Sequence, residues 1–197
     1  KWGGGGAVKD GTGGKISYFR IPLAPGYAWE VSQSWAGHCE ECEAKYPSAG
    51  TAEDPYYCQS SHAHQCFSTC KYGWDFNLPG NDDEGLPALA SGPGAVEDLD
   101  DEKLTGWGNF VVVRHSYGIC TRYAHLKDGS ILVKEGDEIY QGEVLAEIGG
   151  TPNFSPHLHF QFEECDSQQP LEMGFDDGNG VPNENGIPDG VPKCIKG

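Results

Sequence analysis

Residues 155–160 (SPHLHF) and residues 123–126 (YAHL) are the most informative pieces of this sequence. Successive side chains of a β-strand point to opposite faces of the sheet, so residues two apart project from the same face. His157 and His159 are therefore predicted to point the same way, while Leu158 turns to the other side, toward an apolar core.

A third histidine lies on the second of these stretches. By the same alternation, Tyr123 and His125 are predicted to project together from one face of their strand. Three imidazoles on two strands can build a metal site with a proton-accepting group beside it. A His-x-His pair alone is more often structural, so the rest of the chain has to decide between the two interpretations.

The composition is that of an acidic, turn-rich chain. It has 197 residues, a formal net charge of −17, 29 glycines and 13 prolines. The length fits one domain, and the glycines and prolines predict many turns and little helix. The negative charge argues against nucleic acid as a partner, because phosphate binding needs a cationic surface. No apolar run reaches the roughly 18 residues that span a bilayer, so no membrane insertion is predicted. The sequence indicates no particular oligomeric state.

Eight cysteines indicate an oxidising compartment. Their even number is compatible with four disulfides, so the chain is predicted to be secreted. An alternative is a zinc knuckle built on Cys39 and Cys42 with one of the next three cysteines, but the later cysteines do not repeat that spacing. The cysteines stand at positions 39, 42, 58, 66, 70, 120, 165 and 194.

Runs of β-branched and aromatic residues predict a sheet of short strands. Residues 110–113 and 119–123 form the clearest hairpin, and residues 131–133 with 144–149 are predicted to complete another antiparallel pair. The acidic run 97–102 is predicted to be a solvated loop. The expected fold class is mainly β: a twisted antiparallel β-sheet in a single domain, with long disulfide-tied loops and little helix. Further strands are predicted at residues 29–32 and 72–76.

Composition divides the chain into segments. Glycine is so frequent in residues 1–17 that ordering them would cost much backbone entropy, and a flexible N-terminal segment is predicted. Residues 18–170 are predicted to form the folded domain. A cysteine-rich insertion at 38–70 interrupts it and shows neither a helical nor a strand period. Residues 171–197 form an acidic tail rich in Asn, Gly and Pro.

The C-terminal tail carries oxygen-bearing side chains in a short imperfect repeat, which could wrap a calcium ion. The terminal bidentate glutamate of an EF-hand loop is missing, and the tail is at least as compatible with a polar loop pinned by Cys194. The candidate calcium ligands are Asp177, Asn179, Asn183, Asn185 and Asp189.

Asp75 is flanked by aromatic residues, an unusual place for a carboxylate unless another group pairs with it. Asp75, His159 and one upstream histidine would give zinc three protein ligands and leave one position for water, which becomes nucleophilic near neutral pH. His125 and His157 could then take the proton and stabilise the oxyanion. The upstream ligand stays open between His62, His64 and His38.

Several short pieces occur together in a specific order and spacing. They are residues 18–22 (YFRIP), 31–33 (VSQ), 73–79 (GWDFNLP), 85–90 (GLPALA), 108–113 (GNFVVV), 123–126 (YAHL), 133–137 (VKEGD) and 156–160 (PHLHF). In this arrangement the chain resembles the lysostaphin-like zinc metallo-endopeptidases, which cut cell-wall peptides. The resemblance implies that Asp75 and His159 bind zinc, one ion per chain, and that His125 and His157 are the catalytic pair.

One position departs from the family pattern. The compact motif puts its first zinc histidine four residues before the aspartate, where this chain has Lys71, a poor zinc ligand at neutral pH. Other family members carry that histidine further upstream, behind a serine and a variable loop, and Ser61-His62 resembles that version. His62 is therefore predicted as the first ligand, with His64 second and His38 third.

The resemblance implies a secreted zinc-dependent endopeptidase, a hydrolase of peptide bonds that acts through a zinc-activated water. The expected substrate is a glycine-containing peptide bond, in peptidoglycan cross-bridges or in glycine-rich matrix proteins. The alternative is a non-catalytic extracellular binding or structural module that keeps the peptidase fold. The presence of Asp75 and all three late histidines favours the enzyme, because a decayed site would be expected to lose at least one of them.

Overall fold

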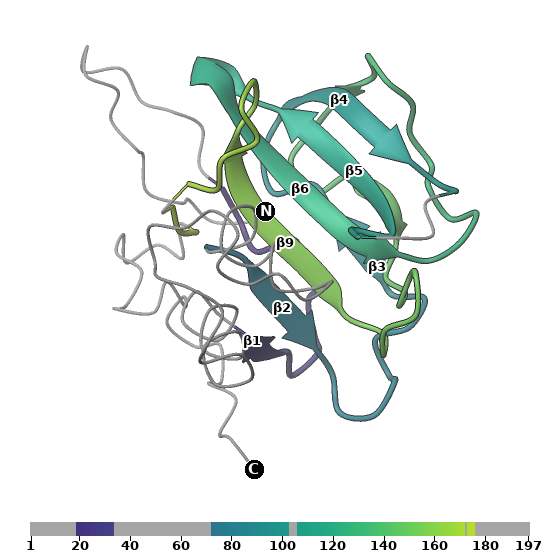
Figure 1. Cartoon of the computed structure of the whole chain (residues 1–197). Helices are drawn as coiled ribbons and strands as arrows, with labels where there is room; N and C mark the ends of the chain where they lie inside the picture. Colours follow the sequence, from purple (N-terminus) through teal and green to yellow (C-terminus); the bar gives the residue numbers. More distant parts are fainter. Residues whose placement is uncertain (1–18, 34–71, 103–105, 172, 176–197) are drawn as a thin grey trace, which may run out of the picture.

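The computed structural model describes residues 19–33, 72–102, 106–171 and 173–175 (Figure 1). The described chain forms a seven-stranded sheet with the order β1-β2-β9-β6-β5-β4-β7 and a two-stranded sheet of β3 and β8. All named strand pairs are antiparallel, which confirms the predicted mainly β fold. The elements are β1 (Glu30–Gln33), β2 (Trp74–Asn77), β3 (Pro87–Leu89), β4 (Gly94–Asp100), β5 (Asn109–Arg114), the 3₁₀ helix η1 (Ser116–Gly118), β6 (Ile119–Leu126), β7 (Glu138–Ile139), β8 (Val144–Glu147) and β9 (Leu158–Glu164).

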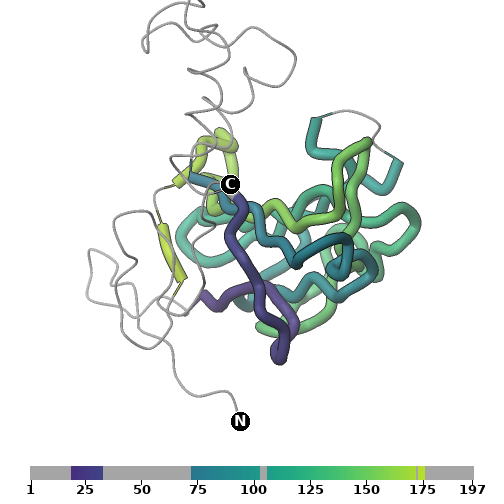
Figure 2. Tube along the Cα trace, turned by 90° about the horizontal axis from the view of Figure 1, so that it is seen from below, coloured from purple at the N-terminus to yellow at the C-terminus, as the bar shows by residue number. Residues whose placement is uncertain are grey.

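The topology brings distant segments together at β9. This strand lies between β2 and β6, so it pairs with one strand from early in the chain and one from the middle. On the outer side of β2, the register sets Val31 of β1 opposite Phe76. Figure 2 shows the purple β1 segment running beside the teal segment that contains β2.

Alternation gives the large sheet two different faces. The core face carries Trp74 and Phe76 of β2 and three residues of β9, namely Leu158, Phe160 and Phe162, all fully buried. The small β3–β8 sheet packs on this face through residues such as Ala88 and Leu145, and Figure 1 shows β3 behind the large sheet. The opposite face, called the polar face below, carries a smaller apolar cluster that includes Phe110, Val112, Cys120 and Ala124.

The predicted hairpin at the centre of the sheet is confirmed as β5, η1 and β6. Two other local predictions are wrong. The acidic run beginning at Glu97 is largely strand, because residues 98–100 pair with β5 while the acidic side chains stay exposed or partly exposed. Residues 131–133 form no strand; β8 pairs instead with β3, a partner more than fifty residues earlier that a local pattern does not reveal.

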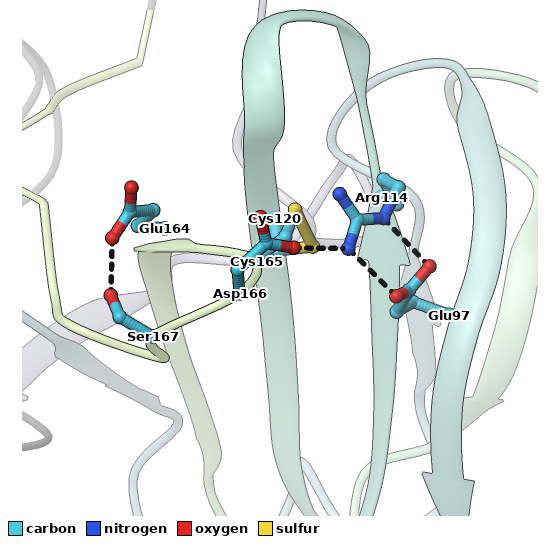
Figure 3. Close-up of polar contacts among 7 residues, drawn as sticks. All are labelled: Glu97, Arg114, Cys120, Glu164, Cys165, Asp166 and Ser167. Carbon is cyan, nitrogen blue, oxygen red and sulfur yellow. Dashed lines mark hydrogen bonds and ion pairs between the residues drawn. A yellow bond between two sulfur atoms is a disulfide. The ribbon is translucent and has the colours of Figure 1, made fainter.

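A disulfide joins Cys120 of β6 to Cys165, which directly follows β9 (Figure 3). Beside it, Arg114 bridges Glu97 of β4 and Asp166 through short ion pairs of 2.7 and 3.0 Å. These contacts fasten the end of the sheet where η1 lies. The other six cysteines, the predicted N-terminal segment, nearly all of the C-terminal tail and the 38–70 insertion lie outside the described residues.

Among the described residues, no helix has both the length and the apolar character needed to cross a membrane.

Candidate active site

The pairing of β2 with β9 places Asp75 directly opposite His159 on the polar face. Their side chains meet, with Oδ1 of Asp75 2.7 Å from Nδ1 of His159, and both residues are buried. Two donors of a tetrahedral zinc ion lie roughly 3.4 Å apart, given metal–ligand distances of about 2.0–2.2 Å. The carboxylate and the imidazole therefore converge nearly as two zinc ligands do, and a small separation of the pair would admit the ion.

His157 lies two residues before His159 and projects from the same face, as the sequence predicts. Its Nε2 is 3.9 Å from Oδ2 of Asp75, while Leu158 between the two histidines is fully buried in the core. Nδ1 of His157 lies 2.8 Å from the carbonyl oxygen of Ser155. A carbonyl oxygen can only accept, so Nδ1 carries a hydrogen, and Nε2 is the nitrogen that faces Asp75.

His125 reaches the same site by a different route from the predicted one. The expected Tyr123–His125 pair on one face is wrong: Tyr123 packs edge-on against Phe160 in the core, whereas the His125 ring lies 4.7 Å from that of His157. The reason is a β-bulge, in which one extra residue reverses the alternation. Ala124 pairs with Phe110 and Leu126 pairs with its neighbour on β5, so His125 is the unpaired residue, held at a left-handed φ of 62°.

Burial controls the protonation of His125. Desolvation, with smaller contributions from the neighbouring His157 and His159, lowers the pKa of its imidazole to about 3, although Asp75 opposes the shift. The ring is therefore neutral at pH 7. Its Nδ1 lies 2.8 Å from the carbonyl oxygen of Thr151 and donates to it, so Nε2 carries the lone pair. The loop before β9 thus anchors His125 through Thr151 and His157 through Ser155, and the Nε2 atom of each ring is left to face the site.

Two aromatic rings flank the histidine cluster. The ring of Phe154, in the loop before β9, lies 4.6 Å from the ring of His125, and Trp107 lies 5.0 Å from the ring of His159. Phe154 is partly exposed and Trp107 is partly buried. The imidazoles therefore lie between bulky neighbours rather than on an open sheet surface.

The polar face continues past His159 through side chains that the sequence analysis did not select. Gln161 and Glu163 occupy the next two positions of the same face of β9, and Arg122 of β6 lies opposite Gln161. All three are buried, and hydrogen bonds connect them to His159. A signal was present, because polar residues at 157, 159, 161 and 163 alternate with Leu158, Phe160 and Phe162.

The rest of the predicted site lies outside the described residues. This holds for His62, for its alternatives His64 and His38, for Lys71, and for the candidate calcium ligands Asp177, Asn179, Asn183, Asn185 and Asp189, all of which stay predictions. Within the described ranges, no three His, Cys, Asp or Glu side chains are grouped so that they could hold a metal ion. Asp75 and His159 supply two donors, and a zinc site would need a third from elsewhere in the chain.

Comparison with known sequences gives a consistent result. The model of peptidase family M23 matches residues 69–172, which is more than half of the chain and includes Asp75 and the three clustered histidines. Peptidoglycan DD-endopeptidase ShyC of Vibrio cholerae is 39% identical over 79 residues, covering 40% of this chain and 17% of that protein. The chain spans between 12% and 33% of the length of the curated relatives it matches.

Comparison with solved structures supports the fold. A zinc-containing peptidase from Vibrio cholerae aligns with a TM-score of 0.52 at 23% identity, over 84% of this chain and 42% of that one. A chain of the SpoIIQ–SpoIIIAH pore-forming complex also aligns with a TM-score of 0.52, at 16% identity, over 85% of this chain and 92% of that one. The same fold therefore occurs in a peptidase and in a pore-forming assembly, so the chemistry of the polar face has to carry the argument for function.

Proposed function

The chain belongs to peptidase family M23, and from this premise we propose that it is a zinc-dependent endopeptidase that cleaves peptide bonds of peptidoglycan. The observation that carries the proposal is the convergence on one face of a carboxylate–imidazole pair, Asp75 and His159, with two further imidazoles. The relatives named as peptidoglycan DD-endopeptidases support the substrate class.

Zinc fits the donor set. Asp75 offers a carboxylate and His159 an imidazole, the oxygen and nitrogen ligands that zinc takes in catalytic sites. His62 is proposed as the third protein ligand, with His64 as the alternative. When bound, zinc supplies a nucleophilic water near neutral pH and polarises the carbonyl of the bond to be cut.

His125 and His157 are proposed to handle one proton between them. Both hold a hydrogen on Nδ1 and present Nε2 as an acceptor, so either nitrogen can take the proton that the attacking water releases. The two rings lie 4.7 Å apart, and a charge on His157 disfavours a charge on His125, which supports the uptake of one proton between them. The protonated Nε2–H then stabilises the oxyanion and returns the proton to the departing amine, which balances hydrolysis of the peptide bond.

A glycine-containing bond is the proposed preference. Trp107 and Phe154 bracket the imidazole cluster, and a residue without a side chain brings its backbone close to the histidines at the lowest steric cost. Action outside the cell is also proposed. The disulfide between Cys120 and Cys165, 45 residues apart, supports an oxidising compartment.

The proposal is tested by incubating purified zinc-loaded protein with two substrates, a pentaglycine peptide and isolated peptidoglycan, and identifying the products by mass spectrometry. Wild type is expected to cut both, and His157→Ala, with the same zinc content, to cut neither at a comparable rate. Products that end in D-alanine with pentaglycine left intact would replace the glycine preference by cleavage of the stem-peptide cross-link.

Equal product formation by wild type and His157→Ala would contradict the mechanism. Failure of the zinc-loaded wild type to cut either substrate would favour the alternative, a non-catalytic extracellular binding or structural module.

A further inference from the structure

A buried hydrogen-bonded network of polar side chains runs along the polar face away from His159. Nε2 of His159 lies 3.2 Å from Oε1 of Gln161, whose amide nitrogen donates to Oε2 of Glu163 at 2.7 Å. Arg122 is the last member of the network and donates to both carboxylate oxygens of Glu163, at 3.0 and 2.8 Å. Gln161 is fully buried, and Glu163 and Arg122 are no more than 2% exposed.

The chemistry of its end groups determines which atoms of this network donate and which accept. The arginine guanidinium can only donate, and an ionised carboxylate can only accept, so Glu163 receives hydrogen bonds from both of its neighbours. The NH₂ group of Gln161 must therefore face Glu163, which leaves its carbonyl oxygen facing His159. An acceptor at that position requires a hydrogen on Nε2 of His159. The Asp75 carboxylate also only accepts, so without a metal Nδ1 donates to it, and a zinc ion bound between the two would take the place of that hydrogen and meet the lone pair of Nδ1.

Aromatic packing holds the Arg122 end of the network. The guanidinium of Arg122 lies over the rings of Trp107 and Phe110, at 5.3 and 4.9 Å from the ring centroids. Trp107 also lies against the ring of His159, so one indole contacts both ends of the network. Neither Gln161 nor Glu163 has room to rotate without breaking a buried hydrogen bond, which would leave an unsatisfied polar group.

Stability alone gives a weak reason for this arrangement. A buried ion pair between Arg122 and Glu163 is often no more stabilising than apolar side chains of similar size, and the other face of β9 is filled by Phe160 and Phe162. A fixed orientation, in contrast, is what buried and fully satisfied polar networks provide.

We propose that Gln161 is a positioning residue for the zinc ligand His159. Held by Glu163 and Arg122, it fixes the tautomer with hydrogen on Nε2, so that Nδ1 faces the metal together with Asp75. This inference rests on the proposed function, because it assumes that Asp75 and His159 bind zinc.

The experiment measures zinc affinity by chelator competition in two glutamine-to-leucine variants of the full chain. Gln161→Leu removes the acceptor for Nε2–H, and outer-shell partners of this kind typically change metal affinity by about 10–100-fold. Gln141→Leu is the matched control, because Gln141 also donates to a buried partner, the carbonyl oxygen of Ser91, on the core side of the molecule. We expect a loss of that size in Gln161→Leu and less than about twofold change in the control.

A swap variant separates orientation from folding. In Gln161→Glu/Glu163→Gln, position 161 still offers an acceptor to Nε2–H and the number of charges is unchanged, so zinc affinity should stay within a few fold of wild type. In zinc-loaded wild type, ¹⁵N spectra of the His159 ring should show a hydrogen on Nε2 and the metal on Nδ1.

Three results would overturn the inference: Gln161→Leu binding zinc as the control does, the swap variant losing affinity as strongly as Gln161→Leu, or the metal on Nε2. If Gln161→Leu does not fold, the swap variant and the spectra decide. Wild type that binds no zinc would overturn both the inference and the proposed function, whereas tight binding with unaffected variants would overturn the inference alone.

Discussion

Two buried histidines, one on each face of the large sheet, show what distinguishes a structural imidazole from one in the candidate site. On the core face, Nδ1 of His115 lies 2.7 Å from the carbonyl oxygen of Pro93, and Nε2 lies 2.8 Å from Oγ1 of Thr121. Its ring packs edge-on against Phe19. Burial lowers its pKa to about 4, so it is a neutral, fully bonded core residue.

His159 on the polar face is equally buried and also has partners for both ring nitrogens, yet its surroundings differ. One partner is the carboxylate of Asp75, and the ring of His125 lies 5.9 Å away. Burial and complete hydrogen bonding therefore do not identify a functional histidine. The distinguishing feature is the convergence of several ionisable groups on one point.

The largest predicted difference in zinc content and hydrolysis is between the two variants that each lack one of these imidazoles. His159→Ala is expected to lose zinc and all measurable hydrolysis, because it deletes a proposed ligand, and to lose the stabilisation that zinc would give. His115→Ala should keep zinc close to one per chain. Zinc content by elemental analysis and product formation by mass spectrometry measure both. Zinc retained in His159→Ala would remove the basis for distinguishing the two faces.

The choice of upstream ligand is tested in the same way. His62→Ala should behave like His159→Ala, while His64→Ala should keep both zinc and thermal stability. Zinc retained in His62→Ala but lost in His64→Ala would move the third ligand to His64.

The next largest effect concerns the other two imidazoles of the polar face. His125→Ala and His157→Ala should keep zinc and lose turnover by about 10²–10⁴-fold, the usual contribution of a general acid–base group. His115→Ala, assayed at a temperature where it stays folded, is the control with near wild-type turnover. A loss of zinc in either variant would reassign that histidine as a ligand.

Stability against pH reports on the core face. The unfolded chain takes up a proton near pH 6.5, whereas buried His115 resists protonation down to about pH 4. The folded state binds fewer protons in this window, so stability falls as the pH falls through it. Relative to wild type, His115→Gln should lower the slope by up to about 1.4 kcal/mol per pH unit between roughly pH 6 and 4.5. Denaturant titrations measure the slope, and identical slopes would show that His115 is not buried as described.

The smallest predicted effect tests the bulge at His125. A residue with a β-carbon at a φ of 62° is strained, and glycine relieves about 1–2 kcal/mol of that strain. His125→Gly should therefore be more stable than His125→Ala by about 1 kcal/mol, although both lack the imidazole. The reverse order in thermal unfolding would place His125 in regular strand geometry, on the face of Tyr123.

Periodicity predicted the part of the site that follows a regular strand. Asp75, His157 and His159 lie where the two-residue alternation puts them, and the β5–β6 hairpin is local enough to be recognised from its own residues. The position of His125 was not predictable in this way, because one inserted residue reverses the face and depends on pairing with β5.

The same physical limit explains the other errors. The β3–β8 pairing joins residues far apart in sequence, and the acidic part of β4 is a strand because it pairs with the buried strand β5. Gln161 and Glu163 could have been recognised from the continued alternation of β9. Their role depends on Arg122 of the neighbouring strand, which β9 alone does not indicate.

The proposed function depends on a zinc site on the polar face, built on Asp75 and His159. Anomalous X-ray diffraction at the zinc absorption edge, on crystals of the zinc-loaded full chain, tests this claim most directly. We expect one strong anomalous peak in contact with the Asp75 carboxylate and the His159 imidazole, with His125 and His157 close by and the third ligand revealed by the same map. A peak elsewhere in the chain, or none at this pair, would contradict the proposed zinc site.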